Sequence, residues 1–96
     1  MSASLTKIGA FAFYQCKSLK NMIIPEKVGS IGKLTFYGCK NLKDIEIKTK
    51  KLTKYNVGKN AFKKIYSKAT IKVVKGKVKV YKEMLRKKGI SKKAKF

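Results

Sequence analysis

The chain contains no histidine, no tryptophan and only four acidic residues among its 96. General acid and base catalysis depends largely on His, Asp and Glu side chains. Two cysteines without histidine offer too few ligands for a structural zinc site, and a nucleophilic cysteine would lack its usual base. No glycine-rich phosphate-binding motif is present either. The composition therefore argues against an enzyme and predicts neither a cofactor nor a metal site.

Long apolar runs are also missing. No segment approaches the roughly 20 continuous apolar residues that a membrane-spanning helix needs, so we expect no membrane span. Residues 1–4 carry no basic region, and the apolar residues that follow already belong to a repeat, so they do not resemble a secretory signal. A start inside a repeat leads us to expect a fragment of a longer protein.

Lysine is the residue type in greatest excess. The chain has 25 Lys and one Arg against four acids, a net charge of +22. Such a surface attracts anionic polymers and membranes. Arginine, however, is the residue that binds phosphate and guanine in bidentate fashion, and it is almost absent. We therefore interpret the lysines first as a solvated coat, with nucleic-acid binding as the alternative.

A repeat of 23 residues organises the first half of the chain. Its apolar and glycine positions are Leu5, Ile8, Gly9, Phe13, Cys16, Leu19, Met22 and Ile24, which recur as Val28, Ile31, Gly32, Phe36, Cys39, Leu42, Ile45 and Ile47. A third copy follows three extra residues within 48–55, and it includes Val57, Gly58, Ala61, Phe62, Ile71 and Val73. A fixed period predicts a solenoid, in which each turn buries its apolar face against the next. We expect Phe13, Phe36 and Phe62 to stack in one interior.

Each copy ends in an alternating segment, which predicts short strands near 21–25, 44–48 and 70–74. Stacked turns would align the outward residues in two rows. The first row is expected to hold Asn21, Asp44, Thr70 and Lys93, and the second Ile23, Glu46, Lys72 and Lys95. Two of the four acids lie in these rows, which argues against a nucleic-acid site there. A cross-strand ion pair between Glu46 and Lys72 is the alternative to a binding role.

The period changes after residue 75. Val78, Tyr81 and Leu85 recur at helical spacing, with Met84 alongside, and predict a helix at about 77–88 that ends before Gly89. Counting 23 residues from the third strand predicts a last strand at about 93–96. We therefore divide the chain into repeats over 1–75 and a C-terminal cap over 76–96 that covers the apolar end of the array. A helix lying on a membrane surface is the alternative interpretation.

Two further pairs occupy equivalent repeat positions. Cys16 and Cys39 should lie about 5 Å apart, which permits a disulfide, although a buried ladder of free thiols is favoured. Tyr14 and Tyr37 follow the core phenylalanines and are expected to be half-exposed, packed on their neighbours or stacked on a ligand.

Two full units carry a family resemblance. They read L-T-K-I-G-A-F-A-F-Y-Q-C-K-S-L-K-N-M-I-I-P over 5–25 and V-G-S-I-G-K-L-T-F-Y-G-C-K-N-L-K-D-I-E-I over 28–47. This pattern resembles the BspA-type leucine-rich repeat, and residues 76–96 resemble the Lys-rich helix and strand that close such arrays in bacterial surface proteins. Leu34, Thr35 and Lys48 depart from the pattern. The resemblance implies an α/β repeat solenoid: a right-handed leucine-rich-repeat coil with short parallel β-strands on its concave side and a C-terminal capping helix and strand. It also implies a secreted or cell-surface setting, adhesion or host interaction, and no catalysis.

The resulting prediction is a non-catalytic adhesion module that binds a host or surface protein or a glycan. The candidate binding residues on the concave face are Asn21, Ile23, Asp44, Glu46, Thr70 and Lys72. The alternative is a Lys-rich electrostatic anchor for a polyanion such as teichoic acid or nucleic acid. Self-association is expected through the uncapped N-terminal end at Leu5 to Phe13.

Overall fold

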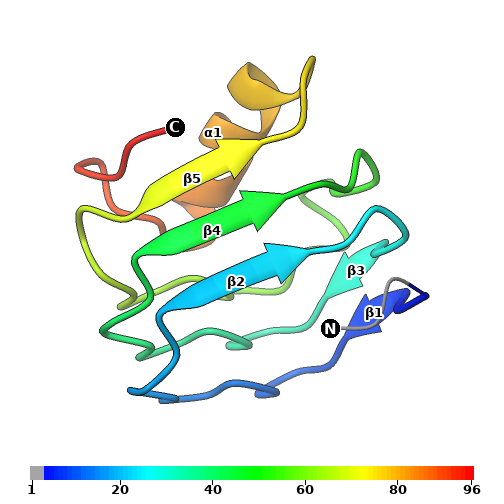
Figure 1. The fold of residues 1–96 in the computed structure, drawn as a ribbon. Helices are drawn as coiled ribbons and strands as arrows, with labels where there is room; N and C mark the ends of the chain where they lie inside the picture. Colours follow the sequence, from blue (N-terminus) through cyan, green and yellow to red (C-terminus); the bar gives the residue numbers. More distant parts are fainter. Residues whose placement is uncertain (1–3) are drawn as a thin grey trace.

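Short strands alternate with long irregular segments in the computed structural model, which describes residues 4–96 (Figure 1). The strands are β1 (Lys7–Ile8), β2 (Asn21–Ile24), β3 (Ser30–Ile31), β4 (Asp44–Ile47) and β5 (Thr70–Val73). One helix, α1 (Val78–Lys87), follows them. The three longer strands each end one residue before the expected boundary, and the helix is one residue shorter at each end.

Two parallel sheets connect the successive turns of the chain. The first has the order β2-β4-β5 and the second pairs β1 with β3. Asn21 pairs with Asp44, and Asp44 pairs with Thr70, so the register follows the 23- and 26-residue offsets of the repeat. Figure 1 shows the three strands side by side, with the turns of the chain stacked behind them. The prediction of short parallel strands is confirmed.

A column of phenylalanine rings runs through the interior. The ring centroids of Phe13 and Phe36 are 5.4 Å apart with an interplanar angle of 3°, and those of Phe36 and Phe62 are 5.1 Å apart at 22°. Phe36 and Phe62 are fully buried, whereas Phe13 is partly exposed at the first turn. All three belong to or pack against one continuous apolar core. The predicted phenylalanine stack is confirmed.

The segments that follow the glycines form a second hydrogen-bonded ladder. Backbone N–H groups of Phe11, Phe13 and Gln15 donate to the carbonyls of Lys33, Thr35 and Tyr37 at 3.1, 2.9 and 2.6 Å. The same two positions have positive φ in each of the three turns: Phe11, Leu34 and Asn60, then Gln15, Gly38 and Lys64. Only Gly38 and Asn60 are residue types that favour this region. The ladder therefore imposes the backbone conformation on residues that do not prefer it.

The repeated glycines allow the backbones of neighbouring turns to meet. A Cβ atom on Gly32 would lie 2.2 Å from the amide nitrogen of Ala10, and one on Gly58 would lie 2.2 Å from that of Lys33. The first glycine of the series, Gly9, has nothing within 4 Å of the equivalent point. Close packing between turns thus excludes any side chain at the second and third glycine positions.

Replacing Gly58 by alanine should therefore destabilise the fold by about 2–3 kcal/mol, because the methyl group displaces the Lys33 backbone. The matched control, Gly9→Ala, should change the stability by less than about 0.5 kcal/mol. Urea denaturation followed by circular dichroism measures both. Equal losses for the two variants would contradict the backbone contact.

Helix α1 packs through one face onto the third turn. Tyr81, Met84 and Leu85 are buried in the apolar core, so this face is not available to a membrane and that interpretation is wrong. Val78, which was expected in the apolar stripe, is 42% exposed because the buried face begins only at Tyr81. The Tyr81 hydroxyl donates to the Thr49 carbonyl at 2.8 Å and accepts from the Leu52 amide at 3.2 Å. The helix thereby holds the three-residue insertion in place.

The last strand expected at 93–96 does not form. A single parallel bridge joins Thr70 to Lys95, and a turn over 91–94 precedes it, in which the Ala94 amide donates to the Ser91 carbonyl at 3.1 Å. This turn shifts the pairing by two residues, so Lys95, not Lys93, follows Thr70. The predicted row positions of Lys93 and Lys95 were therefore wrong.

Candidate functional site

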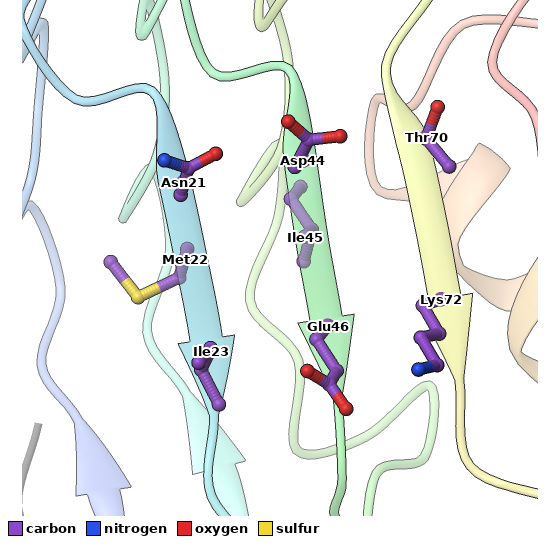
Figure 2. Close-up of a pocket in the computed structure, with 8 residues that line it drawn as sticks. All are labelled: Asn21, Met22, Ile23, Asp44, Ile45, Glu46, Thr70 and Lys72. Carbon is purple, nitrogen blue, oxygen red and sulfur yellow. The ribbon is translucent and has the colours of Figure 1, made fainter.

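The outward residues of β2, β4 and β5 form a surface that we call the sheet face: Asn21, Ile23, Asp44, Glu46, Thr70 and Lys72. Alternation along each strand turns Met22 and Ile24, Ile45 and Ile47, and Ile71 toward the core. The parallel register then places Ile23, Glu46 and Lys72 in one row (Figure 2). All six candidate residues thus lie together on one surface.

Asn21 and Asp44 lie opposite each other at the start of the sheet face. As drawn in Figure 2, the Asn21 amide oxygen faces the Asp44 carboxylate, which places two acceptors against each other. Turning the amide over lets its nitrogen donate to Asp44 Oδ2 at 3.1 Å and to the Lys20 carbonyl at 3.2 Å. This contact orients Asp44 while leaving the residue exposed to solvent.

Ile23 lies in the other row, and its aliphatic side chain is 52% exposed among polar neighbours. Glu46 and Lys72 are register partners in this row, yet among residues 4–96 they form no ion pair within 4.0 Å. Both side chains are therefore free to contact a ligand.

The sheet face is hollowed. A shallow groove of about 270 Å³ runs over both rows of the sheet face. Its lining includes Ile23, Glu46 and Lys72 of one row and Asn21, Asp44 and Thr70 of the other. A second hollow of about 350 Å³ shares Glu46 and Lys72 and continues past the strand ends to Glu26 and Lys48. The lining offers carboxylates, ammonium groups and an aliphatic side chain, which suits binding through mixed contacts.

Neither a metal-binding group of side chains nor a membrane-spanning helix is found in the described part of the chain. Residues 4–96 contain no group of three or more His, Cys, Asp and Glu side chains placed to hold a metal ion. The one helix formed by residues 4–96, α1, has ten residues. It is too short and not apolar enough to cross a membrane.

The two cysteines are free thiols and not a disulfide. Cys39 is fully buried, and its Sγ donates to the Phe13 carbonyl at 3.0 Å. The pKa of the Cys39 thiol is raised, mainly by burial. A hydrogen bond from the Cys16 backbone lowers this pKa, and the charge of Cys16 raises it by a smaller amount. Cys16 is only partly buried at the first turn. The interpretation of the pair as free thiols is confirmed, but the expected burial holds only for Cys39.

Alkylation by iodoacetamide should therefore modify Cys16 first. We expect Cys39 to react at least about tenfold more slowly at about pH 7, because burial limits both access and the thiolate population. A raised pKa moves thiolate formation to higher pH, so the Cys39 rate should still be rising with pH at about pH 9. Peptide mapping by mass spectrometry measures each rate. Equal rates at neutral pH would contradict the buried thiol.

One group of exposed aromatic residues lies outside the sheet face. The rings of Tyr14 and Tyr37 stack with centroids 5.4 Å apart, which agrees with their expected packing on neighbours. The sequence reasoning missed Phe11, whose side chain is 48% exposed. Its position before the core Phe13 in the repeat was the available signal.

Comparison with protein families assigns the repeat. The family model for the BspA type leucine-rich repeat region (6 copies) matches residues 1–93. The chain belongs to this family. BspA-type leucine-rich repeats generally form protein-binding and adhesion modules, and the repeats are typically non-catalytic. A search of curated proteins and a search of solved structures found no match.

Proposed function

We propose that this chain is a non-catalytic recognition module of a secreted or cell-surface protein, which binds a partner protein or glycan through the sheet face. The observation that carries the proposal is the exposed Ile23 in a row with Glu46 and Lys72, all three of which line a groove of about 270 Å³. An aliphatic residue with flanking charges of both signs suits a partner with mixed chemistry better than a uniform polyanion.

The stacked turns support this function by fixing the positions of the binding side chains. Ile23, Glu46 and Lys72 come from three turns, yet the parallel register holds them on adjacent strands. We infer that the turns form a right-handed coil with the sheet face on its concave side. A rigid array of this kind binds with a small loss of side-chain and backbone entropy.

Helix α1 and the segment after it are proposed to cap the C-terminal end of the array. The Lys88 carbonyl accepts the amide of Phe62 at 3.0 Å, and the Lys95 carbonyl accepts that of Ile71 at 2.7 Å. These two contacts satisfy donors on the third turn where a further turn would otherwise pair. The buried face of α1 covers the apolar core at the same end.

The test is a screen of glycans and surface proteins at low and at physiological salt, followed by titration of any ligand against two variants. Ile23→Lys should weaken binding at least about tenfold, because it removes the exposed aliphatic contact of the sheet face. The matched control is Val80→Lys, which alters an exposed aliphatic residue on α1. Equal effects of the two substitutions would contradict the sheet face as the binding surface.

The second candidate function is an electrostatic anchor for a polyanion, favoured by the net charge of +22. An anchor of this kind loses affinity steeply as salt rises and does not depend on Ile23. Ligands that bind at low salt only, and equally to wild type and Ile23→Lys, would support the anchor in place of the recognition module.

A further inference from the structure

A second surface lies on the segments that follow the repeat glycines, outside the sheet face. We call it the aromatic–lysine patch, and it consists of Phe11, Tyr14, Tyr37, Lys33 and Lys64. Phe11 meets Tyr14 edge to face with centroids 5.5 Å apart, and Tyr14 stacks on Tyr37 at 5.4 Å with an interplanar angle of 10°. Phe11 and Tyr14 are 48% and 41% exposed. Three adjoining rings therefore reach solvent.

Ammonium groups lie beside these rings. The Lys33 Nζ is 5.9 Å from the centroid of the Phe11 ring, and the Lys64 Nζ is 5.7 Å from that of Tyr37. The acids of the chain all lie elsewhere: Asp44 and Glu46 on the sheet face, Glu26 beside the adjoining hollow and Glu83 on α1. The patch thus combines aromatic surface with positive charge that no carboxylate on it offsets.

We propose that the aromatic–lysine patch binds a linear acidic polysaccharide, at a site separate from the sheet face. Ammonium groups and tyrosine hydroxyls would donate to the carboxylates or sulfates, and the exposed edges of the rings would pack against the sugars. Successive turns present equivalent tyrosines 5.4 Å apart, a spacing close to the length of one sugar residue in a chain.

Nucleic acid fits this patch less well. Tyr14 and Tyr37 already stack on each other, so no base can enter between their rings. The cations beside the rings are lysines, whereas the single arginine, Arg86, lies on α1. Arginine would supply both the planar stacking and the bidentate phosphate contacts that single-stranded nucleic acid favours.

The first experiment titrates the full chain with polygalacturonate, a linear uronic acid polymer, by calorimetry, with neutral dextran as the uncharged control. The double variant Phe11→Asn, Tyr14→Ser should lower the affinity for polygalacturonate about tenfold. Tyr55→Ser is the matched control, because Tyr55 is 86% exposed beside Lys54 but lies outside the patch. We expect it to change the affinity less than about twofold.

The second experiment separates the patch from the general lysine coat. Lys33→Gln with Lys64→Gln removes the same charge as Lys79→Gln with Lys87→Gln on α1. The slope of log affinity against log salt reports the number of ionic contacts. Only the first pair of substitutions should reduce this slope, by the amount expected for the loss of about two contacts. Equal reductions in both pairs would overturn the proposal in favour of diffuse attraction.

Two other outcomes would also overturn it. The first outcome uses a (dT)30 oligonucleotide. If it binds more tightly than polygalacturonate, and if its affinity falls by the same factor in the double variant Phe11→Asn, Tyr14→Ser, the patch is a nucleic-acid site. If that variant changes only the sedimentation coefficient, the patch contacts a second copy, as in the self-association predicted for Leu5 to Phe13.

Thermal unfolding confirms that each variant is folded, and single Phe11→Asn should keep or raise the midpoint because Asn tolerates positive φ. Since no sheet-face residue is altered, failure here leaves the sheet-face function untouched.

Discussion

Close contact between the backbones of successive turns is the constraint on which the rest of the structure depends. At Gly32 and Gly58 the neighbouring chain approaches so closely that not even a methyl group fits. This contact fixes the register, and the register then aligns equivalent residues of each turn. Phe13 consequently stacks on Phe36, and the apolar core becomes continuous although no single turn has a core of its own.

The same register distributes exposed side chains over two surfaces with different chemistry. Each turn contributes residues to the sheet face and to the segments after the glycines. The sheet face holds two of the four acids of a chain with a net charge of +22, whereas the aromatic–lysine patch holds none. A small scaffold can therefore present a mixed surface and a basic surface at once. In the proposed functions, the lysine coat would supply long-range attraction and the local side chains the selectivity.

The features that recur with the period could be predicted from the sequence, because stacking needs only that equivalent residues meet. These include the phenylalanine column, the three strands and the residues of the sheet face. The features that break the period could not be predicted. The turn before Lys95 displaced the last pairing by two residues, and the hydrogen bonds of Tyr81 to the inserted segment join residues about thirty positions apart. Phe11 comes two residues before the core Phe13, but its backbone conformation could not be predicted, because it comes from the ladder to the next turn.

The central claim is that successive turns lie in register with one continuous interior. Nuclear Overhauser effects between aromatic ring protons test it most directly, in a sample with selectively labelled phenylalanine. The stack predicts cross-peaks between Phe13 and Phe36 and between Phe36 and Phe62, since the ring centroids are 5.4 and 5.1 Å apart, and none between Phe13 and Phe62. Absence of both contacts, or a direct contact between Phe13 and Phe62, would contradict the order in which the turns stack.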